Sequence, residues 1–254
     1  MDKAYYSEYS RLEETHWWFT GRKQILDRLL SNNPAIGKTR CLLNVGCGTG
    51  NLLRFFQSSG RSIGLDVERK ALDYCVDRGL RLLVQGSAPA LPFKSECFDV
   101  IMALDVLEHL DDHSRTLSEF WRICANGGYL VVTVPAFHLL WGDQDLISHH
   151  RRRYTLGELR RIVEQTGFLI EKMTYFNTFL FPIIASIRLV RRLKRRIVPR
   201  ASLRSDFTLA WSAASNHLLG RVFASEASFL SRWAFPFGVS LFVLAKKGAV
   251  PAVA

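Results

Sequence analysis

Short apolar runs alternate with longer segments of helical periodicity over the first half of the chain. Buried strands are predicted at 42–45, 61–65, 80–85, 98–104 and 128–134. Helices are predicted between them, at 51–58, 67–78 and 113–125. Apolar runs that lack polar alternation are typical of strands covered on both faces. The pattern therefore predicts an α/β fold with a parallel sheet and helices on both of its faces.

Three glycines at alternate positions, Gly46, Gly48 and Gly50, end the first apolar run. A strand, a glycine-rich turn and a helix in this order let a ligand rest against bare backbone, because glycine has no Cβ. The spacing differs from the G-x-G-x-x-G of dinucleotide-binding folds, and the Gly-Lys-Ser/Thr of a phosphate loop does not follow. Asp66 ends the second run, about 20 positions after the turn, where a carboxylate can hold a ribose diol. The turn thus predicts a ligand site, and a plain strand-to-helix connection is the alternative.

Four segments, in this order and spacing, resemble the class I S-adenosylmethionine-dependent methyltransferases. They are Gly46-Cys47-Gly48-Thr49-Gly50, then Asp66, then Leu91-Pro92-Phe93 before Phe98-Asp99-Val100, and Asp105-Val106-Leu107-Glu108-His109-Leu110. The resemblance implies a Rossmann-like fold with a mostly parallel seven-stranded sheet, and S-adenosylmethionine as the cofactor. It also implies a set of cofactor-binding residues: Asn44, Gly46, Cys47, Gly48, Gly50, Asp66, Val67, Ser87, Ala88, Leu104 and Asp105.

The same resemblance implies a role for each part of that set. The glycine turn would pass under the methionine moiety, Asp66 would take the ribose hydroxyls, and Leu104 and Asp105 would lie near the methyl donor. Asn44 and Ser87 depart from many relatives, which carry acidic residues at or near these positions. Asparagine keeps a hydrogen-bond acceptor but loses the charge that favours a cationic sulfonium. Both departures keep open a non-catalytic, cofactor-binding assembly module as an alternative function.

Further residues resemble one bacterial subgroup, whose methyltransferases accompany surface-polysaccharide or lipid-linked glycan synthesis. They are His16-Trp17-Trp18-Phe19 with Gly21-Arg22, then Trp141, Asp145, His150, Arg152, Arg153 and Tyr154, and finally the closing strand in 236–247. Among them we expect substrate-binding residues: Trp17, Arg22, Trp141, Arg152, Arg153 and Tyr154. Two adjacent arginines such as Arg152 and Arg153 can hold an anionic acceptor bidentately.

His150 is the candidate general base. It follows the fifth predicted strand, which places it on the ligand side of the sheet, and Asp145 five residues earlier can orient it. A base is needed if the acceptor is a hydroxyl, since the hydroxyl must lose its proton. The alternative is a structural bracket before a helix at 155–165, in which Thr155 is the N-cap and Glu158 completes a capping box.

A metal site is a weaker interpretation of the neighbouring acidic and histidine residues. Asp105, Glu108 and His109 are spaced i, i+3, i+4, so together with His138 or His150 they can bind a divalent ion. We expect instead that the Glu-His pair braces its loop and that no metal is bound. The five cysteines include no C-x-x-C pair, which favours a reduced, cytoplasmic protein without disulfides or a zinc site. The N-terminus carries no apolar segment of the signal-peptide type.

The net charge of +11 is confined to the C-terminal part of the chain. Residues 1–150 contain 16 Lys and Arg against 18 Asp and Glu, whereas residues 151–254 contain 18 against 5. The densest stretch lies within 179–204, where an apolar stripe (Ile183, Ile184, Ile187, Val190, Ile197) adjoins a basic one (Arg188, Arg191, Arg192, Arg195). Its basic residues extend to Arg200 and Arg204.

A basic amphipathic helix of this kind suits the surface of an anionic membrane. Each Lys or Arg near such a surface contributes about 1 kcal/mol, and the apolar run is too short to span a bilayer. A helix that caps the sheet with its charges merely solvated is the alternative. Residues 188–204 contain no aromatic, which argues against nucleic acid as the partner.

These observations predict four parts of one domain. They are an N-terminal helical lid (1–34), an S-adenosylmethionine-binding core (35–177), a basic amphipathic helical insertion before the last strand (178–232), and the closing strand with a tail (233–254). The expected function is O-methylation of a sugar or lipid-linked glycan at the inner, cytoplasmic face of the membrane. A small-molecule O-methyltransferase acting on a quinone or natural product is the alternative.

Overall fold

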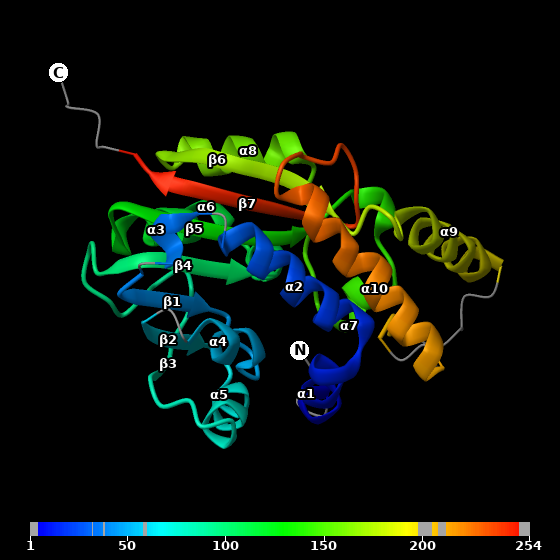
Figure 1. Cartoon of the computed structure of the whole chain (residues 1–254), viewed down its shortest axis with the longest axis horizontal. Helices are drawn as coiled ribbons and strands as arrows, with labels where there is room; N and C mark the ends of the chain where they lie inside the picture. Colours follow the sequence, from blue (N-terminus) through cyan, green and yellow to red (C-terminus); the bar gives the residue numbers. More distant parts are fainter. Residues whose placement is uncertain are drawn as a thin grey trace.

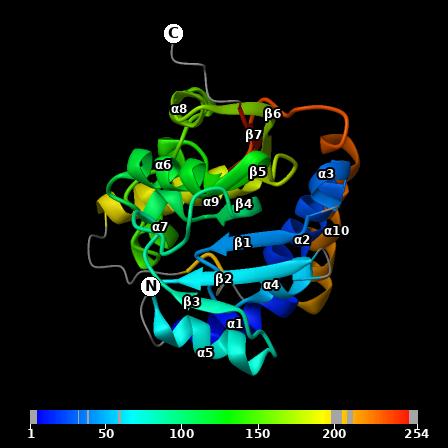
Figure 2. The same cartoon turned by 90° about the vertical axis from the view of Figure 1, so that its left-hand side faces the viewer.

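The protein is described by a computed structural model that covers residues 5–31, 33–37, 39–57, 60–197, 205–207 and 212–248. Within these residues seven strands form one sheet in the order β3-β2-β1-β4-β5-β7-β6, and only β7 runs antiparallel to its neighbours (Figures 1 and 2). The strands are β1 (Cys41–Val45), β2 (Arg61–Asp66), β3 (Leu83–Gln85), β4 (Phe98–Leu104), β5 (Cys124–Pro135), β6 (Phe168–Phe176) and β7 (Ser240–Lys247). The predicted mostly parallel, seven-stranded fold is confirmed.

Helices cover both faces of this sheet (Figure 2). One face is covered by α6 (His113–Ile123) and α8 (Leu156–Gln165), and the other by α2 (Trp17–Ser31), α4 (Asn51–Phe56), α5 (Arg69–Asp77) and α10 (Ala213–Leu230). The remaining helices are α1 (Tyr5–Thr15), α3 (Pro34–Gly37), α7 (Asp143–Ile147) and α9 (Phe181–Ile197), with 3-10 turns at Leu107–His109 and His138–Leu140.

The alternation of side chains along each strand builds two hydrophobic cores. Leu43 and Val45 of β1 pack in the core under α6 and α8, whereas Leu42 packs in the core under α2 and α10. Since successive side chains of a strand point to opposite faces, an uninterrupted apolar run is buried on both sides. This geometry explains why the strands appear in the sequence as short apolar runs.

Local signals place most element boundaries to within two residues, although β5 begins at Cys124, four residues before the predicted start at 128. The predicted capping box is confirmed: Thr155 Oγ1 accepts a hydrogen bond from Glu158 N at 3.3 Å, and Glu158 Oε2 accepts one from Thr155 N at 2.7 Å. The predicted helix at 113–125 ends at Ile123, because β5 begins at Cys124 and pairs there with Phe98. The predicted strand at 80–85 is reduced to β3, Leu83–Gln85.

The predicted insertion at 178–232 contains two helices of different character. The basic residues belong to α9, while α10 has Arg221 as its single Lys or Arg. Helix α10 lies along α2 (Figure 1), and Trp17 of α2 contacts Phe223 of α10 with ring centroids 5.7 Å apart. Thus α10 packs on the core with one face and is not part of a basic amphipathic surface. The predicted basic residues Arg200 and Arg204 lie outside the described residues.

Candidate active site

The glycine turn after β1 adopts the backbone that its sequence predicts. Gly48 (φ +55°) and Gly50 (φ +84°) both lie in the left-handed region that favours glycine. A Cβ on Gly48 would enter open space in the cavity, whereas a Cβ on Gly50 would lie 2.6 Å from Leu80 Cδ1 and 2.8 Å from Cys75 Sγ. Gly48 therefore leaves room for a ligand, and Gly50 leaves room for the packing of the turn.

Asp66 lies at the end of β2, beside the glycine turn. Its Oδ2 accepts a hydrogen bond from Gly48 N at 2.8 Å, and its Oδ1 accepts one from Glu68 N at 2.9 Å. Burial raises the pKa of Asp66, which these backbone hydrogen bonds partly offset. The two N–H groups hold the carboxylate in one orientation at the edge of the cavity.

A cavity of about 570 Å³ extends from this turn over the carboxyl ends of the parallel strands. Of the predicted site residues, its wall includes Trp17, Arg22, Gly46, Gly48, Asp66, Val67, Ser87, Ala88, Leu104, Asp105, His150 and Arg153. Among the residues that the structure describes, this lining does not include Asn44, Cys47, Gly50, Trp141, Asp145, Arg152 or Tyr154. Asn44 is buried within β1, and its position does not favour a direct contact with a ligand in the cavity.

The N-terminal helices α1 and α2 also contribute to the cavity wall, and α1 lies against the glycine turn. Tyr6 and Tyr9 of α1 line the cavity, and so does Phe207, whose ring centroid lies 5.1 Å from that of Phe19. Glu13 of α1 accepts a hydrogen bond from Thr49 Oγ1 in the glycine turn and forms an ion pair with Arg78. Phe207 carries no local signal in the sequence, because the helical periodicity of the basic stretch does not extend beyond Ile197.

At the centre of the cavity, Arg22 of α2 meets the end of β4. Arg22 Nη2 lies 3.0 Å from Asp105 Oδ2 and donates a hydrogen bond to Thr133 Oγ1 at 2.8 Å. The same guanidinium lies over the Trp18 ring, 4.8 Å from its centroid. Asp105 has a positive φ (58°), an unusual backbone for a non-glycine residue that is frequent at functional sites.

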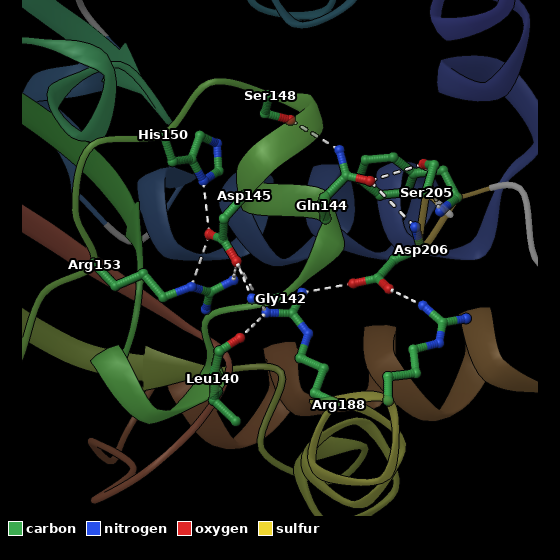
Figure 3. A network of polar contacts seen from close by, with 12 residues as sticks. Leu140, Gly142, Gln144, Asp145, Ser148, His150, Arg153, Arg188, Ser205 and Asp206 are labelled. Atoms are coloured by element: carbon green, nitrogen blue, oxygen red, sulfur yellow. Dashed lines mark hydrogen bonds and ion pairs between the residues drawn. The ribbon is translucent and has the colours of Figure 1, made fainter. Parts of the chain in front are cut away.

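Asp145 is the hub of a buried polar network (Figure 3). Its Oδ1 accepts from His150 Nδ1 and Arg153 Nε, both at 2.8 Å, and its Oδ2 accepts from Arg153 Nη2 at 3.0 Å. Burial alone would raise the pKa of Asp145, but the hydrogen bond from His150 and the charges of Arg153 and Arg188 hold its pKa below the ordinary range. The predicted pairing of His150 with Asp145 is present in the structure.

Arg152, Arg153 and Tyr154, which we expected to bind the acceptor, form hydrogen bonds within the protein. Arg153 is buried, and all of its guanidinium nitrogens donate, to Asp145 and to the carbonyl of Ala136. Arg152 donates to the carbonyls of Leu110 and Asp111, and Tyr154 donates to that of Leu107. These side chains hold neighbouring loops together, which is the structural role that we gave above as the alternative for this segment. Trp141 lines a separate, smaller hollow beside Gly142 and Arg191.

A cluster of two histidines and one carboxyl group lies on the cavity wall next to this network. His150 Nε2 is 4.0 Å from Glu108 Oε1, and the rings of His150 and His109 have centroids 4.8 Å apart. Burial lowers the pKa of His109 to about 4 and raises that of Glu108 well above its ordinary value. The other candidate ligand, His138, lies elsewhere and pairs with Glu158 at 3.4 Å.

Helix α9 forms the apolar end of the cavity through Ile183, Ile184 and Ile187, together with Leu180 just before the helix. Its basic side chains do not all face solvent, contrary to the predicted basic stripe. Arg188 donates to Leu140 O and to Asp206 Oδ2, both at 2.7 Å (Figure 3), and Arg191 donates to Asp206 Oδ1 at 2.8 Å. Arg192 is exposed, and the side chain of Arg195 lies outside the described residues.

The fold, the glycine turn and the acidic end of β2 define a class I methyltransferase domain. Residues 43–132 match the family model of the methyltransferase domain. A probable S-adenosylmethionine-dependent methyltransferase of Mycolicibacterium smegmatis is 28% identical over 164 residues, which are 63% of this chain and 62% of the relative. A phthiotriol/phenolphthiotriol dimycocerosates methyltransferase of Mycobacterium ulcerans is 35% identical over 128 residues, 46% of each chain.

A solved structure shares the whole fold. The S-adenosylmethionine-dependent methyltransferase of Thermotoga maritima, a possible histamine N-methyltransferase, aligns with a TM-score of 0.58 at 17% identity and covers 97% of this chain and 98% of its own. The chain spans less than two thirds of the length of the curated relatives it matches. Residues 43–132 therefore carry a methyltransferase domain in a fold of the class I type, and its cofactor is S-adenosylmethionine. No helix within the described residues is both long enough and apolar enough to cross a membrane.

Proposed function

We propose that the protein transfers the methyl group of S-adenosylmethionine to a hydroxyl of a sugar or lipid-linked glycan at the cytoplasmic face of a membrane. The observation that carries this proposal is the shape of the cavity. It runs from the glycine turn past Asp105 to an apolar end formed by Leu180, Ile184 and Ile187. A cavity with a polar centre and an apolar end suits an acceptor with a polar head and an apolar tail.

The chain's own residues fit the cofactor. The open space above Gly48 admits a ligand against the backbone, and Asp66 presents an oriented carboxylate where ribose hydroxyls would lie. Val67 is 62% exposed next to Asp66, so its side chain is free to pack on an adenine ring. When bound, S-adenosylmethionine supplies an electrophilic methyl group, whose bond to sulfur breaks as the bond to the acceptor oxygen forms.

The acceptor hydroxyl must also lose its proton, and His150 is placed to receive it. Because Nδ1 of His150 donates to Asp145, Nε2 is the free acceptor and lies on the cavity side. Arg22 and Asp105 line the same cavity as this histidine, where they can orient the acceptor. Much of the rate of such a displacement comes from alignment of the reacting groups.

The outer side of α9 supports contact with a membrane. Leu189, Val190 and Leu193 are 53%, 50% and 48% exposed, and the neighbouring Arg192 and Lys194 are exposed as well. Apolar side chains flanked by basic ones bind the surface of an anionic bilayer. This apolar end of the molecule adjoins the apolar end of the cavity, since Ile184 and Ile187 of the same helix line it.

Methyl transfer is tested with S-adenosylmethionine that is labelled on its methyl group. The protein is incubated with a bacterial lipid extract, and the label is counted in the organic and aqueous phases. We expect label in the organic phase, and loss of both turnover and S-adenosylhomocysteine binding in Asp66→Ala. Asp73→Ala, on the exposed side of α5, is the matched control. Tight binding of the product without turnover on any extract would favour the non-catalytic module.

Vesicle flotation tests the membrane contact. We expect flotation with vesicles that contain anionic lipid and none with zwitterionic vesicles. Leu189→Asp combined with Leu193→Asp should abolish flotation, whereas Val76→Asp on α5, at a side chain 42% exposed, should leave it unchanged. Flotation of the double variant at the wild-type level would contradict the proposal for α9.

A further inference from the structure

Glu108 stands out because a buried carboxyl group has no partner. The residue is 0% exposed, and neither of its side-chain oxygens has a hydrogen-bond partner among the residues that the structure describes. Its closest ionic contact there, His150 Nε2, is 4.0 Å away, too far for a hydrogen bond. Buried polar groups without partners are costly and rare. Something other than a described side chain therefore completes this site.

His150 is oriented toward the same point. Asp145 binds its Nδ1 at 2.8 Å and is itself held by two hydrogen bonds from Arg153, so the ring cannot easily turn (Figure 3). A carboxylate that fixes one ring nitrogen and leaves the other free is the usual arrangement around a metal-ligating histidine. The hydrogen bonds from Arg153 to Asp145 thus fix the carboxylate that would hold a metal-ligating His150 in place.

We propose that Glu108, His109 and His150 bind one divalent cation of the zinc class. One donor atom from each residue can be chosen so that all three lie within 4.8 Å of one another. A tetrahedral ion with ligand distances of about 2.1 Å needs its donors roughly 3.4 Å apart, so small side-chain rotations close the site. Two imidazoles and one carboxylate favour Zn²⁺, Co²⁺ or Fe²⁺ over Mg²⁺ and Ca²⁺, which prefer oxygen ligands.

The ion would keep an open coordination position. All three ligands line the cavity, next to Asp105 and Arg22, so that position faces the space for the acceptor. An acceptor hydroxyl that binds there loses its proton to water more readily, and its oxygen then forms the bond to the methyl carbon as the carbon–sulfur bond breaks. His150 is then a ligand of the ion and not the base. This catalytic role rests on the proposed function, whereas binding of the ion does not.

The test uses tag-free protein that has been dialysed against a chelator. Zn²⁺ binding is measured by calorimetry, and Co²⁺ binding by its visible absorption. We expect one equivalent in the wild type, at least ten-fold weaker binding in Glu108→Gln and in His150→Ala, and unchanged binding in His138→Ala. Asp145→Asn, which weakens the support of His150, should bind about 10- to 100-fold more weakly.

Two outcomes would overturn the proposal: the wild type binds neither ion, or Glu108→Gln binds both as tightly as the wild type. Circular dichroism and S-adenosylhomocysteine affinity report whether each variant is folded. If Glu108→Gln is not folded, the ion affinity of His150→Ala tests the proposal in its place. If the wild type binds the ion but not S-adenosylhomocysteine, the proposed function fails and the metal site stands. If it binds S-adenosylhomocysteine but no ion, the metal site is refuted and the proposed function stands.

Discussion

Gly48→Ala tests whether the glycine turn cradles the cofactor. At φ +55° an alanine costs about 1–2 kcal/mol relative to glycine, since its Cβ crowds the backbone. The added methyl group meets no protein atom within 4 Å, and Gly48 itself lines the cavity. If a ligand fills that space, the overlap costs a further 1–3 kcal/mol or so, which corresponds to a loss of roughly 5- to 150-fold in affinity.

The assay compares two quantities in the same variant. Urea denaturation gives the free energy of unfolding without ligand, and calorimetry gives the dissociation constant of S-adenosylhomocysteine. Gly50→Ala is the matched control: its φ is also positive, but its methyl group would lie 2.6 Å from Leu80. We expect Gly48→Ala to lose mainly affinity and Gly50→Ala to lose mainly stability. Wild-type affinity in a folded Gly48→Ala would refute the role assigned to the turn.

Two further predictions concern stability. Burial raises the pKa of Glu226 to about 7 from an ordinary value near 4.5, so between these pH values the folded state keeps a proton that the unfolded state has released. Stability is thus lost as pH rises through this window, by about 2–3 kcal/mol. Urea denaturation at pH 4.5 and 8 should show a smaller loss of stability in Glu226→Gln than in the wild type. An equal loss in both proteins would contradict the prediction. Gly21→Ala places a Cβ 2.5 Å from Phe223 Cδ1, where α2 packs on α10. It should lower stability by about 1–3 kcal/mol, whereas Gly157→Ala, with open space in α8, should not; equal melting temperatures for the two variants would refute this packing argument.

The meeting of Gly48 and Asp66 at one edge of the sheet could be predicted because its signals are local. A strand, a turn and a helix follow one another within residues 41–56, and Asp66 ends the neighbouring strand of the same sheet. Parallel strands bring their carboxyl ends to one edge, so residues at strand ends gather without further information. The capping box of Thr155 and Glu158 is local in the same sense.

The acceptor half could not be predicted, because residue type does not reveal a side chain's partner. Arg153 and Arg188 look like ligands for an anion in the sequence, but Asp145 and Asp206 pair with them inside the protein. Phe207 likewise enters the cavity wall from a segment without periodic pattern.

The sequence by itself determined the sheet, its two covered faces and the edge at which Gly48 and Asp66 meet. Apolar periodicity records which residues are buried, and the order of strands and turns sets the edge at which a ligand binds. Only the tertiary structure decided which charges are free. It showed that Arg188 and Arg191 of α9 pair with Asp206, and it brought Glu108 to His150, 42 positions later in the chain. Ion pairs and ligand clusters depend on distances between remote segments, and no local pattern contains those distances.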